Sequence, residues 1–226
     1  MLGVTDKSEP KKIALEERGE VGDRLFSPSA SRNRDVIRDV FMSEMPEHGV
    51  FLEIASGTGE HVAHLAAAMP KAHFLPGDPD MASRASIEAW THYLKLSNIA
   101  PPHAIDASAT GWEGAIGPID GVYCINMIHI APFGAAKGLI RGAGKILKPG
   151  GRLFLYGPFA RNGVHSAPSN EAFDASLKSR DPRWGVRDLD RDIVPLAEAA
   201  GMRLSALHEM PANNLAVIFL SEAATA

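Results

Sequence analysis

Residues 51–60 read FLEIASGTGE. This apolar run passes into small residues and then, without a linker, into HVAHLAAAM, whose apolar residues have helical spacing. Gly57 and Gly59 have no side chain, so their backbone tolerates unusual dihedral angles and a ligand can approach it closely. The stretch predicts a strand, a tight ligand-binding loop and a helix in direct succession.

Apolar runs alternate with helical stretches along most of the chain, which predicts a parallel sheet covered by helices on both faces. Near the C-terminus, RLSALHEMP and NLAVIFLS are joined by a short turn sequence and predict a hairpin with one antiparallel strand. We therefore expect an α/β, Rossmann-like fold with a seven-stranded, mostly parallel sheet and an antiparallel C-terminal hairpin strand. The other apolar runs are VFLEIA at 50–55, HFLPGD at 73–78, PHAIDA at 102–107, GVYCINMI at 121–128 and RLFLYG at 152–157.

The length and composition fit one hydrophobic core, because the chain has 226 residues and is 45% hydrophobic. Residues 1–22 are charged and poor in large apolar groups, which predicts a flexible N-terminal arm. We expect residues 23–226 to form a single domain. Cys124 is the only cysteine and lies in an apolar run, so we expect a buried thiol without a disulfide or metal cluster.

Charge and hydropathy argue against several classes of partner. The chain has 23 basic and 27 acidic residues and a formal net charge of −4, so it lacks the positive excess that attracts nucleic acid or anionic lipid. It has no apolar run of about 18 residues that could span a bilayer, and its N-terminus lacks the apolar segment of a secretory signal. We expect a cytoplasmic protein with no nucleic-acid and no membrane partner, and we leave a homodimer open.

The glycine loop favours a cationic ligand over a dinucleotide. A dinucleotide-binding fingerprint has a third glycine three residues after Gly59, where this chain has Val62. Glu53, four residues before Gly57, would repel a pyrophosphate but attract an ammonium group. S-adenosylmethionine carries an ammonium and a sulfonium group. We therefore expect it as the cofactor, with Glu53, Gly57 and Gly59 in its binding site.

Two further strand ends supply candidates for the nucleoside half of this cofactor. Asp78 ends the next apolar run, 19 residues after Gly59, where a carboxylate can accept hydrogen bonds from both ribose hydroxyls. Asp106 closes PHAIDA and is predicted to contact the adenine edge, while Ala107 leaves room for the ring. An aspartate at a strand end can also serve only as a helix cap. Taken together, the strand ends predict sites for methionine, ribose and adenine in order.

Seven strings in the chain resemble the class I S-adenosylmethionine-dependent methyltransferases. Within that class they are similar to the family catalogued as domain of unknown function 938, known in animals as methyltransferase-like protein 26. The resemblance implies the class I methyltransferase fold and the methyl donor, but not the acceptor. Ala55 departs from the class pattern, because many members have a glycine there, and its methyl group could narrow the donor pocket. The strings, which extend from about Phe26 to Leu220, are FSPSASRNRD, LEIASGTGEH, INMIHIAP, LFLYGPF, SNEAFDASL, RDPRWGVRDL and MPANNL.

Candidate catalytic residues follow the runs at 121–128 and 152–157, because ligands of open α/β sheets lie outside the carboxyl ends of the strands. His129 is the candidate general base, since its ordinary pKa is near neutrality; ordering of the following turn is the alternative. Tyr156 is predicted to hydrogen-bond the acceptor, with packing as the alternative. Asn126 is assigned to the cofactor site, although it could contact the acceptor or stabilise a turn. A base is needed only if the acceptor arrives protonated.

Arginines around the FSPSAS segment are candidates for binding an anionic group, such as the carboxylate of the donor. They are Arg24, Arg32 and Arg34. We favour Arg32 and place Asn33 beside it in the predicted cofactor site. The alternative for each arginine is a solvated ion pair on the first helix.

The segment 158–188 lies between the last parallel strand and the hairpin and could form a lid. Its candidate ligand-contacting residues are His165, Asn170, Arg183 and Trp184. On the helix after the glycine loop, His61 and His64 have a spacing that resembles two metal ligands, but the sequence offers no evident third ligand, so we predict no metal.

Two rival functions share this fold. An NAD-dependent oxidoreductase is disfavoured by Val62 and by the lack of a recognisable Tyr-x-x-x-Lys pair. A non-catalytic binding protein would be expected to have lost residues of the donor loop, which are all present here. We expect methyl transfer to a small organic acceptor, while a protein side chain stays open as an alternative. The sequence does not decide whether oxygen, nitrogen or sulfur is methylated.

Overall fold

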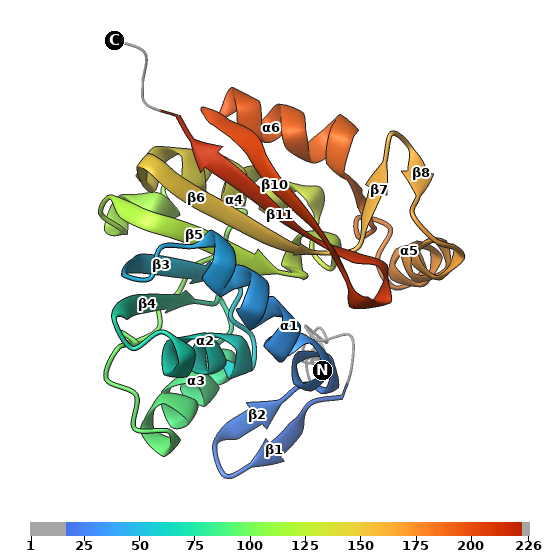
Figure 1. The fold of residues 1–226 in the computed structure, drawn as a ribbon. Helices are drawn as coiled ribbons and strands as arrows, with labels where there is room; N and C mark the ends of the chain where they lie inside the picture. The colour runs from blue at the N-terminus through green and yellow to red at the C-terminus, as the bar shows by residue number, and fades with distance from the viewer. Residues whose placement is uncertain (1–16, 223–226) are drawn as a thin grey trace, which may run out of the picture.

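A computed structural model of the chain describes residues 17–222. Its centre is a six-stranded sheet with the strand order β10-β11-β6-β5-β3-β4 (Figure 1). Neighbours among β4, β3, β5 and β6 pair in parallel, whereas β11 pairs antiparallel with both β6 and β10. The sheet is therefore mostly parallel with an antiparallel hairpin strand, as the sequence predicts. The strands are β3 (Gly49–Ile54), β4 (Ala72–Gly77), β5 (Ile119–Ile125), β6 (Leu147–Gly157), β10 (Met202–Met210) and β11 (Asn214–Ser221).

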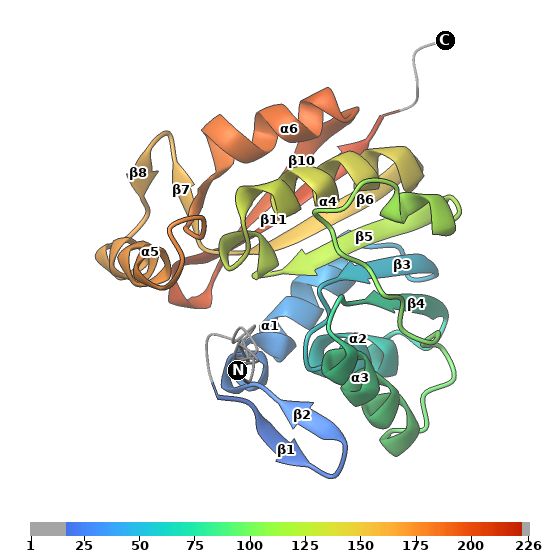
Figure 2. The same cartoon turned by 180° about the vertical axis from the view of Figure 1, so that it is seen from behind.

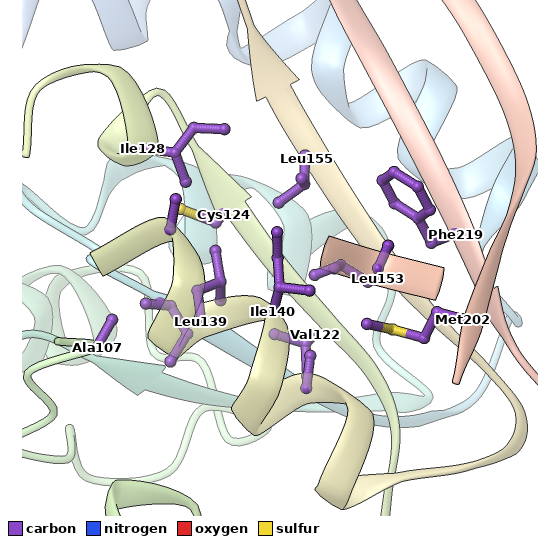
Figure 3. Close-up of a cluster of buried hydrophobic side chains, with 14 of the residues drawn as sticks. Ala107, Val122, Cys124, Ile128, Leu139, Ile140, Leu153, Leu155, Met202 and Phe219 are labelled. Carbon is purple, nitrogen blue, oxygen red and sulfur yellow. The ribbon is translucent and has the colours of Figure 1, made fainter. Parts of the chain in front are cut away.

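Helices cover both faces of the sheet (Figures 1 and 2). One face is covered by α1 (Pro28–Glu44) and α2 (Glu60–Ala68), with α3 (Met81–Tyr93) packed into the same buried cluster, and the other by α4 (Phe133–Ile146) and α6 (Val194–Ala199). Successive strand residues point to opposite faces, so Leu153 and Leu155 join the α4 side while Phe154 and Tyr156 join the α1 side. Figure 3 shows the core on the α4 side, which includes the buried Cys124.

The run PHAIDA does not form the seventh strand that its position predicts. The segment around it follows the free edge of β4 and forms only two isolated parallel bridges, Phe74 with Ile99 and Gly77 with His103. Pro101 and Pro102 lie between these bridges, and prolines have no amide hydrogen to donate to a neighbouring strand. The path of the chain beside β4 is thus as expected, but a continuous strand is not formed.

Part of the N-terminal arm expected at residues 1–22 forms a strand, while its flexibility stays a prediction. Residues 1–16 lie outside the described residues, but β1 (Gly19–Val21) pairs antiparallel with β2 (Arg24–Phe26). The sequence did not predict this hairpin. All residues of β1 are exposed, so the strand has no apolar pattern that would indicate it. β2 provides the anchor, since its Leu25 is hydrogen-bonded to α3 through both its amide and its carbonyl.

The segment 158–188 forms a small unit beside the end of the hairpin (Figure 1). It contains a three-stranded sheet of order β8-β7-β9 and the helix α5 (Pro168–Arg180). None of the helices among residues 17–222 is long and apolar enough to cross a lipid bilayer. The remaining elements are β7 (Phe159–Arg161), β8 (Val164–His165), β9 (Arg187–Asp188), a π-helix at Leu189–Ile193 and 3₁₀ turns at Trp112–Ala115, Met127–His129 and Pro211–Asn213.

Candidate functional site

The loop between β3 and α2 has the strained backbone that its sequence predicts. Ala55, Gly57 and Gly59 all have positive φ values, of 61°, 57° and 84°. A β-carbon on Gly59 would lie only 2.9 Å from Ile87 of α3, so this glycine permits close packing of the two helices. Among residues 17–222, a β-carbon on Gly57 would meet only the guanidinium of Arg18, at 3.8 Å. Gly57 therefore presents the approachable surface of the loop.

Asp78 lies at the carboxyl end of β4 and points to this loop. Its Oδ2 accepts a 2.9 Å hydrogen bond from the amide of Gly57, and its Oδ1 accepts one of 2.9 Å from the amide of Asp80. The residue is 4% exposed, and burial raises the pKa of its carboxyl group. The carboxylate thus ties two adjacent strand ends together at the place where we predicted a ribose-binding group.

Glu53, at the end of β3, is a buried acid with an unused oxygen. It is 1% exposed, and its Oε2 has no hydrogen-bond partner among the described residues. Burial raises its pKa to about 8, a hydrogen bond with Ser56 opposes this shift, and the charge of Asp78 adds to it. An unpaired buried carboxylate is costly, whereas a cation beside it would restore its ordinary ionisation. This residue has the chemistry of a site for a positively charged group.

Asp106 and Ala107 are placed less favourably for a ligand. The carboxylate of Asp106 is exposed and closes a local turn by accepting hydrogen bonds from the amide and hydroxyl of Ser108, at 2.8 and 2.6 Å. Ala107 is buried against α4, where a β-carbon on Gly138 would collide with its carbonyl oxygen. Contact of either residue with an adenine ring stays a prediction.

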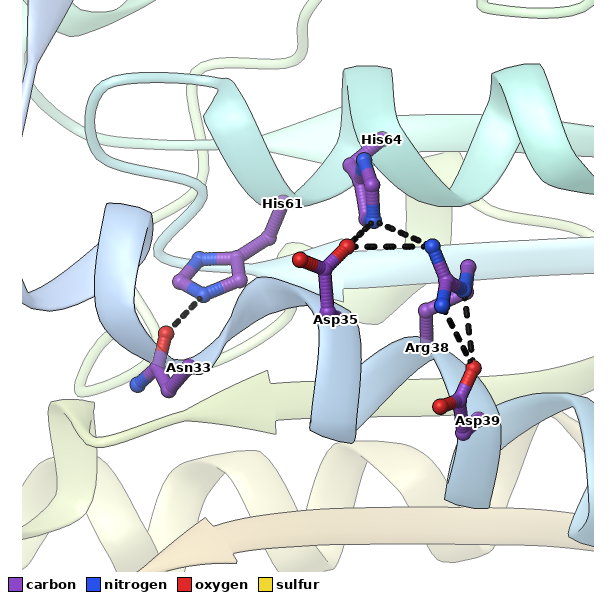
Figure 4. A network of polar contacts seen from close by, with 6 residues as sticks. All are labelled: Asn33, Asp35, Arg38, Asp39, His61 and His64. Atoms are coloured by element: carbon purple, nitrogen blue, oxygen red, sulfur yellow. Dashed lines mark hydrogen bonds and ion pairs between the residues drawn. The ribbon is translucent and has the colours of Figure 1, made fainter.

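A chain of polar side chains joins α2, α1, β6 and β11 on the α1 face. Nε2 of His61 lies 2.9 Å from Oδ1 of Asn33 (Figure 4). The side chains of Asn33 and Asn214 in turn hydrogen-bond the hydroxyl of Tyr156. Burial raises the pKa of this hydroxyl, and the two amides oppose the shift. Tyr156 is therefore held in place by two amides as well as packed in the core, and the donor contact predicted for Asn33 stays a prediction.

The two histidines of α2 have separate partners. His64 lies 2.9 Å from Asp35 and 3.2 Å from Arg38, while His61 contacts Asn33 (Figure 4). Burial lowers the pKa of His61 to about 4, so its ring is neutral at pH 7. Among residues 17–222, no group of three or more histidine, cysteine, aspartate or glutamate side chains is placed to hold a metal ion.

His129 has an environment that does not suit a general base. The ring is 0% exposed, and its Nδ1 accepts a hydrogen bond from the amide of Arg187 in β9. Burial, with the nearby charge of Arg187, lowers its pKa to about 3. In this enclosed position the ring is a weaker base than an ordinary histidine. The ring therefore links the segment 158–188 to the end of β5, and its role as a general base stays a prediction.

Asn126 lies at the carboxyl end of β5 beside that of β6. It has a φ of 64°, and its amide donates a 2.8 Å hydrogen bond to the carbonyl of Tyr156. A β-carbon on Gly157 would lie 2.6 Å from Nε2 of His129 and 3.3 Å from Oδ1 of Asn126. Gly157 thus lets these two side chains approach the end of β6 closely. The side chains of Asn126 and His129 thus lie together at the end of β6, whereas Tyr156 contacts Asn126 through its backbone and packs its side chain on the α1 face.

The arginines of the FSPSAS region have different surroundings. Arg24 stacks over the ring of Tyr93, 3.6 Å from its centroid, and also lies over Trp90 and Phe26. Arg32 is exposed on α1, whereas Nε of Arg34 is buried without a hydrogen-bond partner in the described part of the chain. Arg24 therefore makes cation–π contacts, which the sequence analysis did not predict when it favoured Arg32 for the ligand.

The segment 158–188 is fastened to the C-terminal hairpin. Nδ2 of Asn170 donates hydrogen bonds to the carbonyl of Asn213 and to Ser166, both at 2.9 Å, and Nδ2 of Asn213 donates one of 3.0 Å to Ser169. Arg183 forms an exposed ion pair with Asp181. Asn170 is thus a structural link between α5 and the hairpin turn. Lid movement of this segment stays a prediction.

Sequence reasoning missed two charged residues at the glycine loop. Glu60 accepts hydrogen bonds from the amide of Ser27 and the hydroxyl of Thr58, at 2.6 and 3.0 Å. Its place as the first residue of α2 could have indicated it, because acids stabilise helix N-termini. Arg18 lies in a polar stretch without periodicity, and the sequence contains no signal that could have identified it.

A family model described as "Protein of unknown function (DUF938)" matches residues 24–221. Among solved structures, the fold is similar to that of an O-methyltransferase family protein from Burkholderia thailandensis, with a TM-score of 0.73 and 15% identity over 87% of this chain and 57% of that one. Human N-acetylserotonin methyltransferase, solved in complex with SAM, matches with a TM-score of 0.68 and 15% identity over 86% of this chain and 53% of its own.

A third similar structure is an O-methyltransferase family 2 protein from Planctomyces limnophilus in complex with apigenin. It matches with a TM-score of 0.69 and 14% identity over 85% of this chain and 61% of its own length. The chain therefore spans between half and two thirds of these proteins. At these identities the likeness establishes the fold, which is that of class I methyltransferases.

Proposed function

We propose that this chain, which belongs to the DUF938 family of proteins of unknown function, transfers a methyl group from S-adenosylmethionine to a small organic acceptor. The observation that carries the proposal is Glu53, whose Oε2 is buried and unpaired beside the glycine loop. The donor has an ammonium group, and pairing with it would offset the cost of burying this carboxylate.

The residues present fit the donor at three points. Glu53 would bind the ammonium group, the open face of Gly57 would let the ligand lie against the backbone, and Asp78 would bind the ribose hydroxyls. Each oxygen of Asp78 accepts one backbone hydrogen bond and retains capacity for another. These groups occupy the carboxyl ends of β3 and β4, which is where an open α/β sheet binds its ligand.

When bound, the donor supplies a methyl carbon that its sulfonium group makes electrophilic. The chain then has to hold the acceptor in line with that carbon and exclude water, and positioning alone can supply much of the acceleration. Tyr156 and Asn126 lie at neighbouring strand ends and would orient the acceptor by hydrogen bonds. Because His129 is too weak a base, we infer that the acceptor arrives with an available lone pair or loses its proton to water.

A small acceptor agrees with two of the similar proteins, of which one is named for N-acetylserotonin and the other was solved in complex with apigenin. The formal net charge of −4 also gives no electrostatic reason to expect nucleic acid. The closer kinship with methyltransferase-like protein 26, the cytoplasmic location and a homodimer stay predictions, as do the donor contacts of Arg32, Ala55 and Ala107.

A screen for methyl transfer tests the proposal. Purified protein is incubated with S-adenosylmethionine carrying a labelled methyl group and with pools of small alcohols, phenols, amines and thiols. We expect label to appear in at least one acceptor pool and to disappear when Asp78→Ala replaces the wild-type protein. The proposal would be overturned if no pool became labelled and the protein did not bind S-adenosylmethionine. Binding of NAD by the protein would instead favour the oxidoreductase.

A further inference from the structure

Arg18 lies directly over the glycine loop, although it comes from the N-terminal end of the described chain. Its Nη1 donates a 3.1 Å hydrogen bond to the hydroxyl of Ser83 in α3. If Gly57 carried a β-carbon, Nη2 of Arg18 would lie 3.8 Å from it. Among the described residues, apart from those next to Gly57, no other heavy atom would lie within 4 Å of that β-carbon. The guanidinium therefore faces the same surface of Gly57 that a ligand would approach.

The β1–β2 hairpin, which follows Arg18, is fixed to the glycine loop and to α3. The amide of Leu25 donates a 2.8 Å hydrogen bond to the hydroxyl of Ser86, which in turn donates one of 2.7 Å to the carbonyl of Thr58 in the glycine loop. Nε1 of Trp90 donates a 3.0 Å hydrogen bond to the carbonyl of Leu25. The β1–β2 hairpin, which we call the strap, is thus fixed to α3 and, through Ser86, to the glycine loop, and Figure 2 shows it beside α3.

The charge of Arg18 acts on the carboxylates at the end of β4. Burial raises the pKa of Asp78, and Arg18 opposes this shift. Burial also acts to raise the pKa of Asp80, but hydrogen bonds from Ser83 together with the charge of Arg18 lower it on balance. The guanidinium, which lies against Gly57 and Ser83, therefore also acts on Asp78, the residue that we assign to the ribose.

A purely structural role would not require this position. Ser83 is already bound to Asp80, which accepts 2.8 Å hydrogen bonds from both its amide and its hydroxyl and caps α3. Nη2 points instead to the open face of Gly57. A guanidinium has five donors in a rigid fork, so it can bond Ser83 and a ligand oxygen at the same time.

This inference rests on the proposed function. We propose that Arg18 retains the bound donor by donating a hydrogen bond to one of its oxygen atoms, with the β1–β2 hairpin as the strap that carries it. The oxygen can belong to the carboxylate of the methionine half or to the ribose, since both accept hydrogen bonds from a guanidinium. Two ligands distinguish these sources: S-adenosylhomocysteine has both groups, and 5′-methylthioadenosine has only the ribose.

The test measures binding rather than turnover. Wild-type protein, Arg18→Ala and Arg18→Lys are titrated with both ligands by calorimetry, and dissociation rates are followed by stopped-flow fluorescence. Arg203→Ala is the matched control, because Arg203 is exposed on β10, at the opposite edge of the sheet from β4, and forms a 3.5 Å ion pair with Glu222. Unfolding temperatures without ligand check that each variant is folded.

We expect Arg18→Ala to bind S-adenosylhomocysteine about tenfold more weakly than wild type, because one charge-assisted hydrogen bond is lost. Most of this loss should come from faster dissociation. The affinity of Arg18→Lys for S-adenosylhomocysteine should lie between those of wild type and Arg18→Ala, and the affinity of Arg203→Ala should equal that of wild type. An equal loss for 5′-methylthioadenosine assigns the contact to the ribose, and no loss for it assigns the contact to the carboxylate. If Arg18→Ala binds and releases S-adenosylhomocysteine as wild type does, the inference is overturned while the proposed function stands. If wild type binds neither ligand, the proposed function itself fails.

Discussion

Oδ2 of Asp78 accepts a 2.9 Å hydrogen bond from the backbone amide of Gly57, and this bond joins the carboxyl end of β4 to the loop that follows β3. The same carboxylate is the group that we assign to the ribose. Its position is therefore set before any ligand binds, and it fixes the shape of the loop as well as contributing to recognition.

Replacing Asp78 by alanine should weaken both the fold and donor binding. The amide of Gly57 would lose its acceptor, which we expect to lower the free energy of unfolding by about 1–3 kcal/mol. Donor affinity should fall by at least about tenfold. Chemical denaturation and calorimetric titration measure the two effects, and Glu47→Ala is the control because its exposed carboxylate pairs with Lys71 on the surface. Unchanged affinity in the Asp78 variant would remove this residue from the donor site.

Donor binding should depend on pH through Glu53. In the free protein its pKa is raised to about 8, so the group is mostly protonated at pH 7, whereas pairing with an ammonium group requires the ionised form. We expect affinity for S-adenosylhomocysteine to rise from pH 6 to pH 8 and then to level off. Glu53→Gln should bind more weakly, with no such rise. The same pH profile in the variant would contradict the assigned role.

The stability of the unliganded protein should also depend on Glu53. Its folded pKa is above its ordinary value of 4.5, so the folded state retains a proton that the unfolded state has lost between about pH 4.5 and pH 8. The contribution of the protonated group to stability is therefore lost as pH rises through this window. We predict that Glu53→Gln unfolds at a higher temperature than wild type at pH 8, and that the difference decreases at pH 5. A difference that grows toward low pH would contradict the assignment.

His129 should contribute to acid sensitivity rather than to proton transfer. Its folded pKa is lowered from 6.5 to about 3, so the unfolded state binds a proton between these values that the folded state does not. Stability from the neutral ring is full above pH 6.5 and is lost as pH falls below it. We expect His129→Ala to lower the free energy of unfolding by about 2–4 kcal/mol at pH 7 and to show a weaker decline toward pH 5. Denaturation at several pH values tests this.

The hydrogen bond between Asn33 and Tyr156 should appear as energetic coupling between α1 and β6. Tyr156→Phe removes a buried hydroxyl that two amides bond, and we expect a loss of about 1–2 kcal/mol of stability. A double-mutant cycle with Asn33→Ala should give a coupling of roughly 0.5–1.5 kcal/mol. Strictly additive losses would mean that the two side chains do not interact in solution.

The parts of this molecule that the sequence predicts well are those with strong local patterns. The apolar run 50–55, the glycines at 57 and 59 and the helical spacing after them specify β3, the loop and α2 directly. The alternation of leucine with Phe154 and Tyr156 likewise explains how β6 faces two cores. Local periodicity and turn chemistry suffice for these elements.

Other features depend on contacts between segments that are distant in the sequence, so no local sequence pattern predicts them. The pKa of His129 is set by burial beneath β9, which is supplied by a segment almost 60 residues further along the chain. Arg18 reaches the glycine loop only because Leu25 docks on α3. The sequence contains the prolines at 101 and 102, but it does not show that they lie opposite the edge of β4. Their interruption of the edge strand follows from the two isolated bridges that flank them. Tertiary context decides each of these.

Calorimetric titration of the wild-type protein with S-adenosylhomocysteine at pH 8, with NAD as the comparison ligand, tests the central claim most directly. We predict one binding site per chain in the micromolar range or tighter, at least about tenfold weaker in Glu53→Gln, and no heat of binding with NAD. Absence of binding to S-adenosylhomocysteine by folded protein, or equal binding by the Glu53 variant and wild type, would contradict the account of a carboxylate-walled site for a cationic nucleoside.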